Sequence, residues 1–182
     1  NFSAFAALNM LRQVAQQNND KKLEAEITDI MNKIEDYFKK YAFNKEEGVF
    51  YQGGFYVDGQ FRPSKDFAVD CQTWGVTVLG GAWIDKQFGD GTAYKIWQNT
   101  KDRSGYIEDG ALKGVGFSDT HDILSSEWSF GAVLMAKSLS FNYKTSHPDW
   151  SGNLEKDANA VRVGIETLKV KLPDGSISYK YA

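Results

Sequence analysis

Two acidic residues stand at matching points of a repeated sequence unit. Asp70 and Glu127 are 57 positions apart, the interval that also separates Gly48 from Gly105, and each acid begins an apolar, helix-like run. A pair of carboxyl groups can cleave a glycosidic bond when one protonates the leaving oxygen and the other activates water. The repeat therefore predicts a carbohydrate site, with Glu127 as acid and Asp70 as base. The alternative is that both acids only interact favourably with the dipoles of their helices.

Aromatic side chains accompany both acids. Trp74 and Trp128 follow them by four positions or fewer. An indole ring can stack on a sugar ring, so both are candidate substrate contacts, although the apolar run around Trp74 also suits packing in the core. Three tyrosines in the glycine-rich loops complete this candidate set: Tyr51, Tyr56 and Tyr106.

A polar cluster precedes Glu127 in the sequence. Asp119, His121 and Asp122 can supply a base or hydrogen bonds to a substrate, or they can form an ordinary solvated loop with a capping aspartate. The cluster lacks a recognised calcium-loop pattern. One cysteine and two histidines fall short of a typical His/Cys zinc site. The sequence therefore predicts no metal and no other cofactor.

The composition limits the classes to which this protein can belong. The chain has 182 residues, of which 42% are hydrophobic, and this is enough for one domain with a sizeable core. A net charge of −3 does not favour nucleic acid as a partner. No apolar run approaches the roughly 20 residues that cross a bilayer, so no membrane span is expected. The single cysteine, Cys71, excludes a disulfide within the chain.

Helices must position the candidate residues. Two runs, 70–88 and 125–141, are apolar nearly all round, which is typical of buried helices. Two others, 21–43 and 153–172, carry a single apolar stripe and are expected to cover the buried helices from outside. Two shorter helices complete the expected set, at residues 2–17 and 92–99.

Long segments rich in glycine and aromatic residues connect each outer helix to the next inner one. Residues 44–69 and 101–124 are two such loops, and residues 51–61 are expected to form a short β-hairpin that turns at Asp58-Gly59. Gly175 begins a third copy of the pattern. Because successive helices alternate in direction, these loops gather at one end, where functional residues are often found. The predicted fold class is all-α, a helical-hairpin array with short β-hairpins at one end.

This arrangement resembles about half of an (α/α)6 toroid of the six-hairpin glycosidase type. The resemblance is carried by residues 70–75 and 126–131 and by the turns at Gly48, Gly105 and Gly175. It implies an inverting glycoside hydrolase in which a Glu is the general acid and an Asp or Glu is the general base. It also implies that the chain, residues 1–182, is a single partial domain of a longer protein, completed by the remainder of the parent chain or by another subunit.

Two functions of different classes follow from these patterns. The first is a carbohydrate-active enzyme that hydrolyses an oligosaccharide or polysaccharide. The second is a non-catalytic carbohydrate-binding or structural assembly protein on the same scaffold. Terpene cyclases of the ionising type share the toroid architecture, but the chain lacks the Asp-rich motif that their chemistry requires. A secreted or periplasmic location is compatible with either function, and the sequence does not fix the compartment.

Overall fold

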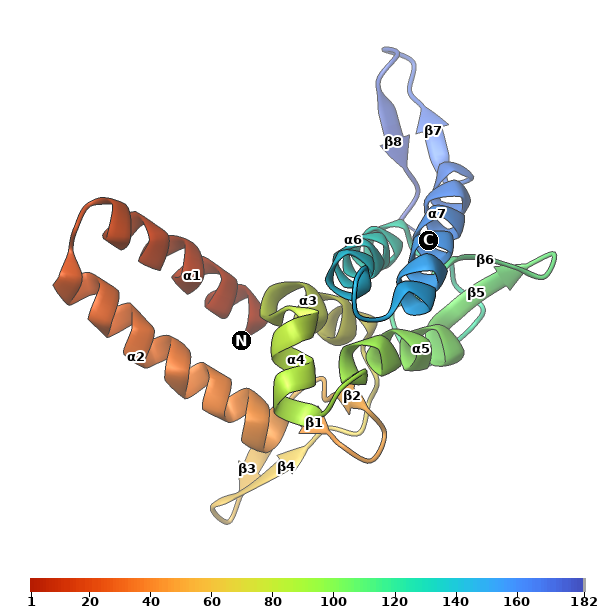
Figure 1. The fold of residues 1–182 in the computed structure, drawn as a ribbon. Helices are drawn as coiled ribbons and strands as arrows, with labels where there is room; N and C mark the ends of the chain where they lie inside the picture. The colour runs from red at the N-terminus through yellow and green to blue at the C-terminus, as the bar shows by residue number, and fades with distance from the viewer. Residues whose placement is uncertain (182) are drawn as a thin grey trace.

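The structure combines helices with β-hairpins (Figure 1). It is a computed structural model that describes residues 1–181. Helices hold 59% of the chain and strands hold 15%, and the strands of the described residues form four two-stranded antiparallel sheets. The prediction of an all-α partial toroid is therefore wrong. Glycine-rich segments without helical periodicity pair as short strands, because tight turns bring each segment back onto itself.

Each strand pairs with its neighbour in the sequence, and the hairpins lie between helices or after the last one. Within residues 1–181, no helix combines the length and apolar character needed to cross a membrane, as the sequence predicts. The helices are α1 (Phe2–Gln17), α2 (Lys21–Tyr37) with a π-helical turn η1 (Phe38–Ala42), α3 (Val69–Leu79), α4 (Gly81–Phe88), α5 (Thr92–Ser104), α6 (Ser126–Tyr143) and α7 (Pro148–Glu166). The strands are β1 (Phe43–Asn44), β2 (Val49–Phe50), β3 (Gly54–Val57), β4 (Gln60–Pro63), β5 (Gly105–Glu108), β6 (Ala111–Val115), β7 (Lys169–Lys171) and β8 (Ile177–Tyr179).

Some helix boundaries differ from those that periodicity predicts. The single helix expected over 70–88 is broken at Gly80, whose φ of +83° favours glycine, so α3 and α4 are separate. The helix expected at 92–99 continues for another turn as α5. Helix α7 begins at Pro148, a favourable first position for proline, and ends at Glu166 because the chain then enters strand β7.

The glycines of the repeated hairpins do not all play the same part. Gly105 opens strand β5, and the turn of that hairpin is made by Gly110 with a φ of +73°. Gly48 and Gly175 occupy the corresponding turns before β2 and β8. The hairpin predicted to turn at Asp58-Gly59 is confirmed, since β3 and β4 meet there.

Helices α3 and α6 pack on each other as an inner row, and α1 contacts α3 near the N-terminus and then runs away from it beside α2 (Figure 1). Helix α2 packs along α1, α5 packs on α3, and α7 packs along α6. Val76 of α3 and Met135 of α6 are fully buried, whereas the long helix α2 buries Ile27 and Met31 on one face. The predicted inner and outer arrangement therefore holds for the buried faces of α3 and α6, but neither helix is buried all round, because Trp74 and Leu134 are exposed.

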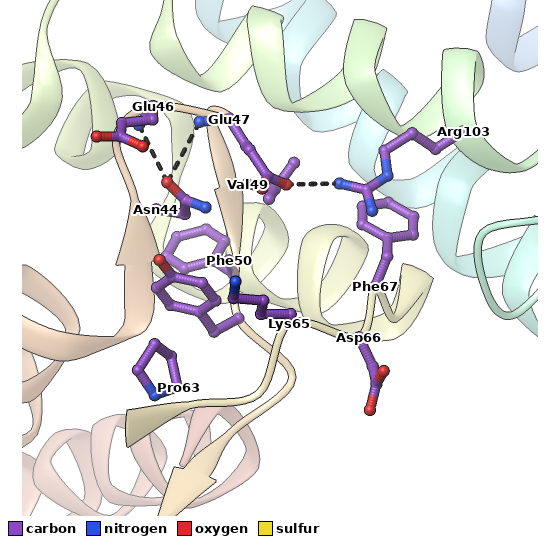
Figure 2. A pocket seen from close by; sticks show the side chains of 11 residues that line it. Asn44, Glu46, Glu47, Val49, Phe50, Pro63, Lys65, Asp66, Phe67 and Arg103 are labelled. Atoms are coloured by element: carbon purple, nitrogen blue, oxygen red, sulfur yellow. Dashed lines mark hydrogen bonds and ion pairs between the residues drawn. The ribbon is translucent and has the colours of Figure 1, made fainter. Parts of the chain in front are cut away.

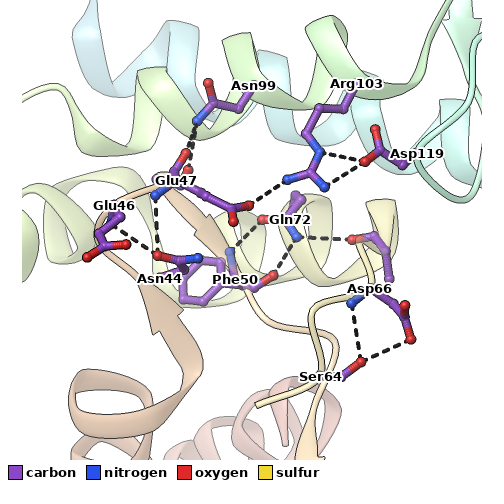
Figure 3. Close-up of polar contacts among 12 residues, drawn as sticks. Asn44, Glu46, Glu47, Phe50, Ser64, Asp66, Gln72, Asn99, Arg103 and Asp119 are labelled. Carbon is purple, nitrogen blue, oxygen red and sulfur yellow. Dashed lines mark hydrogen bonds and ion pairs between the residues drawn. The ribbon is translucent and has the colours of Figure 1, made fainter.

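A buried polar side chain ties α3 to the β1–β2 hairpin, and another ties α6 to the β5–β6 hairpin. Gln72 is fully buried, accepts a hydrogen bond from Phe50 N–H at 2.7 Å and donates to Phe50 C=O at 2.8 Å (Figure 3). Ser129, 57 positions later, is also fully buried, accepts from Val115 N–H at 2.9 Å and donates to Val115 C=O at 3.2 Å. The repeat is therefore one of structure as well as of sequence.

The residues just after a hairpin also cap the start of an inner helix, the one that lies one repeat earlier in the sequence. Val69 N–H, at the start of α3, donates to Phe117 C=O at 3.2 Å, just beyond β6. Ser126 N–H, at the start of α6, donates to Tyr181 C=O at 2.9 Å, just beyond β8. Because the first N–H groups of a helix have no partner within the helix, these bonds fix where each inner helix begins.

Replacement of Gln72 should measure how much the tie between α3 and the hairpin contributes. Gln72→Leu keeps a similar volume but leaves Phe50 N–H and C=O without partners, at about 1–3 kcal/mol for each buried group. We expect the free energy of unfolding to fall by about 2–4 kcal/mol in denaturant titrations followed by circular dichroism. Gln13→Leu, at an exposed helical position, is the control and should change it by less than about 0.5 kcal/mol. An equally small change for Gln72→Leu would contradict the role of this side chain.

Candidate functional site

Asp70 and Glu127 lie in the first turns of neighbouring inner helices. Asp70 is in the first turn of α3 and Glu127 in the first turn of α6. The end of β6 and the residues just after it connect the starts of the two helices, because Val115 C=O accepts from Ser125 N–H at 3.0 Å and Phe117 C=O caps α3. The structure therefore brings the two acids to the same end of adjacent helices, as their matching place in the repeat predicts.

The two carboxyl groups differ in their surroundings. Asp70 is half-buried, and its Oδ1 accepts a hydrogen bond from Cys71 N–H at 2.8 Å. Glu127 is exposed, and its carboxyl group has no hydrogen-bond or ion-pair partner among residues 1–181. One carboxyl is thus held in place, and the other is free to reach a ligand.

A polar cleft lies between the first hairpin and the segment before α3, and we call it the loop cleft (Figure 2). Its volume is about 200 Å³. A more open hollow of about 480 Å³ adjoins it and shares Lys65, Asp66 and Phe67, adding Phe117 and Asp119 to the walls. The loop cleft is lined by Asn44, Glu46, Glu47, Val49, Phe50, Tyr51, Pro63, Lys65, Asp66, Phe67 and Arg103.

Arg103, at the end of α5, holds three segments around the loop cleft (Figure 3). Its Nη1 donates to the Glu47 carboxylate at 2.9 Å, and its Nη2 donates to the Asp119 carboxylate at 2.7 Å. Its guanidinium carbon lies 4.2 Å from the centroid of the Phe67 ring. The hydrogen bond to Asp119 is the main cause of a raised pKa at Arg103. Because a guanidinium presents several donors in a rigid plane, one side chain can join all three segments.

Two of the predicted substrate contacts line these hollows. Tyr51 is half-buried in the loop cleft, and burial is the main cause of its raised pKa. Asp119 lines the adjoining hollow but is engaged by Arg103. Trp74 lies elsewhere, in an apolar groove between α3 and α6, and is 48% exposed rather than packed in the core. Trp128 packs against the core, and its Nε1 is buried without a partner among residues 1–181.

The remaining predicted contacts lie away from the loop cleft. Tyr56 is exposed on β3 and contacts Phe61 of its own hairpin, and Tyr106 is half-buried on β5. His121 Nδ1 is 2.8 Å from Gly105 C=O, so this ring holds a loop to the start of β5. The backbone N–H of Asp122 donates to Thr120 Oγ1 at 3.3 Å. The structure therefore does not gather the Asp119, His121 and Asp122 cluster into one site.

Sequence analysis missed all five charged residues that line the loop cleft, which are Glu46, Glu47, Lys65, Asp66 and Arg103. Lys65 and Asp66 stand just before Asp70, and a charged pair within an aromatic, glycine-rich segment was the available signal. No sequence pattern connects Arg103 with Glu47, because 56 positions separate them. Only folding brings this pair together.

Comparisons with known proteins give no match for this chain. No protein-family model, no curated protein and no solved structure matches it. Within residues 1–181, no group of three or more His, Cys, Asp or Glu side chains is arranged to hold a metal ion. The function must therefore be inferred from the residues and their geometry.

The thiol of Cys71 offers a test of the charge at Asp70. Burial, and then the Asp70 carboxylate, raise the pKa of Cys71 from 9.0 to about 12. Because the thiolate is the nucleophile, iodoacetamide should modify Cys71 more slowly at pH 8 than it modifies a free cysteine, and the rate should still be rising at pH 10. Asp70→Asn should lower the pKa of the thiol and speed the reaction at pH 8, whereas Asp149→Asn on α7 should not. Equal rates for Asp70→Asn and the unmodified protein would contradict a negative charge beside the sulfur.

Proposed function

We propose that the chain is a carbohydrate-active protein and that it hydrolyses glycosidic bonds with a pair of carboxyl groups. The observation that carries the proposal is the equivalent placement of Asp70 and Glu127 in the first turns of α3 and α6, whose starts are connected through residues 115–117. The resemblance of residues 70–75 and 126–131 to six-hairpin glycosidases supports the same assignment.

The chemistry assigns different roles to the two acids. Inverting hydrolysis needs one carboxyl group that donates a proton to the leaving oxygen and one carboxylate that activates water on the opposite face of the sugar, roughly 6.5–9.5 Å away. Asp70 is assigned the base, because the hydrogen bond from Cys71 N–H to its Oδ1 holds the carboxyl group in one orientation. Glu127 is assigned the acid because the resemblance gives that role to a glutamate, and its carboxyl group is not engaged by other described residues.

The loop cleft would hold further units of an oligosaccharide or polysaccharide. Its walls offer both charged hydrogen-bonding groups, from Lys65 and Asp66, and the aromatic ring of Tyr51. Sugars present hydroxyl groups at their edges and an apolar face, so a wall of this kind complements them. At the two ends of the inner helix row, we propose that the remainder of the parent chain or another subunit is the partner.

A second candidate function is carbohydrate binding without catalysis. One observation favours it: Tyr51 and Asp66 line the loop cleft, whereas Asp70 and Glu127 do not. A protein of this kind would bind polysaccharide equally well when the two acids are replaced by their amides.

Replacement of each acid by its amide separates the two candidates. Glu127→Gln keeps the shape of the side chain but removes the transferable proton, so we expect hydrolysis to slow about 10²–10⁴-fold. Asp70→Asn should slow it similarly by removing the base. The measurement is the release of reducing ends from a panel of polysaccharides, with the anomeric form of the product followed by NMR. Asp149→Asn, in the first turn of the outer helix α7, is the control for loss of a helix-dipole interaction.

The outcomes distinguish catalysis from a structural role. Near-normal turnover in Glu127→Gln would show that Glu127 only stabilises α6. Binding of polysaccharide without hydrolysis, unchanged in Glu127→Gln and Asp70→Asn, would favour the second candidate. Circular dichroism of each variant verifies that the helices remain folded.

Tyr51 tests whether the loop cleft binds sugar. Tyr51→Ala removes the aromatic wall of the cleft, and we expect polysaccharide affinity to fall about 3- to 10-fold, equivalent to about 0.5–1.5 kcal/mol. Affinity electrophoresis in gels that contain the polysaccharide measures the change. Tyr56→Ala, on the exposed β3–β4 hairpin, is the matched control and should keep the affinity. An equal loss in Tyr56→Ala would place the sugar on that hairpin instead of in the loop cleft.

A further inference from the structure

A second polar hollow lies beside the β5–β6 hairpin, and we call it the hairpin hollow. Its volume is about 500 Å³, which is within the range of small-molecule sites, roughly 300–1,000 Å³. Its lining residues differ from those of the loop cleft and of the hollow that adjoins the loop cleft. Four polar side chains and two apolar ones form its walls: Lys101, Asp102, His121, Asp157, Ile107 and Leu112.

The hairpin hollow occupies the place in the second repeat that the loop cleft occupies in the first. The loop cleft is bordered by the β1–β2 hairpin, by the residues before α3 and by α5. The hairpin hollow is bordered by the β5–β6 hairpin, by His121 in the segment before α6, and by α7 (Figure 1). The repeat therefore produces a polar hollow twice, each between a hairpin and the outer helix that follows it.

Close packing and buried hydrogen bonds hold the walls of the hairpin hollow together. Gly164 of α7 leaves no room for a β-carbon beside Lys113 C=O of β6, so the hairpin packs tightly on α7. Asp157 Oδ2 on α7 accepts hydrogen bonds from Lys101 Nζ at 2.7 Å and from Trp97 Nε1 at 2.8 Å, and both donors belong to α5. Because these contacts fix the walls in advance, ligand binding would cost little conformational entropy.

His121 presents a hydrogen-bond acceptor to the hairpin hollow. Its Nδ1 is 2.8 Å from Gly105 C=O, and a carbonyl oxygen only accepts hydrogen bonds, so Nδ1 carries the proton. In the neutral ring Nε2 is then the unprotonated nitrogen, and it has no partner among residues 1–181. The bond at one nitrogen thus fixes the ring and leaves the other nitrogen free for a ligand.

Two further polar groups complement His121. Asp157 Oδ1 accepts no hydrogen bond from residues 1–181, and Lys101 Nζ uses only one of its three N–H groups within this range. Ile107 and Leu112 lie in the same hollow and add an apolar surface. The hairpin hollow therefore offers hydrogen-bond acceptors, hydrogen-bond donors and an apolar wall together.

The charges around the hairpin hollow limit the kind of ligand. Lys101 carries a positive charge, and Asp102 and Asp157 carry a negative charge each, so an anion is not favoured. A metal ion is not favoured either, since no group of three or more His, Cys, Asp or Glu side chains in residues 1–181 is arranged to hold one. A neutral ligand with several hydroxyl groups fits best, because each hydroxyl both donates and accepts.

We propose that the hairpin hollow binds a neutral sugar unit. His121 Nε2 and Asp157 Oδ1 accept hydrogen bonds from its hydroxyl groups, and Lys101 Nζ donates to them. Ile107 and Leu112 contact the apolar face of the sugar ring. This site is additional to the loop cleft and uses none of the residues assigned to hydrolysis, so it does not rest on that activity.

NMR titration of the isotope-labelled protein provides the test, because each reporter group has a matched control in the chain. The probes are glucose, mannose, galactose and xylose, each titrated into the millimolar range. With at least one of them, the Trp97 Nε1–H and His121 imidazole resonances should shift along one saturation curve, because Trp97 donates to Asp157. The Trp83 indole N–H, which also donates to a carboxylate, and the His147 imidazole are the controls and should not shift.

Replacement of His121 decides whether its Nε2 binds the sugar. His121→Phe keeps a flat ring but removes the acceptor, and the affinity measured at Trp97 Nε1–H should fall about 3- to 10-fold. His147→Phe is the control and should keep the affinity. Glu127→Gln should also keep it, so a failure of the proposed hydrolysis would leave this result unchanged. Circular dichroism verifies the fold of each variant.

Three results would overturn the proposal. The first is that none of the four sugars shifts the Trp97 and His121 resonances. The second is that inorganic phosphate shifts them at a lower concentration than every sugar, because that result indicates an anion site. The third is an unchanged affinity in His121→Phe, which would show that the ring only holds its loop to β5.

Discussion

The buried hydrogen bonds of Gln72 and Ser129 are the constraint on which the rest of the structure depends. A two-stranded hairpin leaves the outer edge of each strand without backbone partners, and burial of such groups costs about 1–3 kcal/mol each. Gln72 satisfies both backbone groups of Phe50, and Ser129 satisfies both groups of Val115. Helix α3 is thereby fixed in position and rotation against the β1–β2 hairpin, and α6 against the β5–β6 hairpin.

The placement of the two acids follows from this constraint. Asp70 and Glu127 each stand two positions before the side chain that binds the hairpin, so their places relative to the strands are set together. The loop cleft then forms where the first hairpin meets the segment before α3, and Arg103 holds the surrounding segments through Glu47 and Asp119. A surface that must bind an extended ligand benefits from such bracing, because loops otherwise lose conformational entropy when the ligand binds.

The sequence by itself determined the features that depend on local pattern. Helical periodicity set the bounds of α1, the Asp58-Gly59 pair predicted one hairpin, and the 57-residue interval placed Asp70 and Glu127 at the same end of adjacent helices. Only the tertiary structure decided the other strands, which are two to five residues long and are stable only when paired. It likewise decided the loop cleft, because the Arg103 and Glu47 side chains that border it meet across 56 positions of sequence. Local patterns reflect interactions between residues that are close in the sequence. A contact between residues 56 positions apart forms only once the helices have packed.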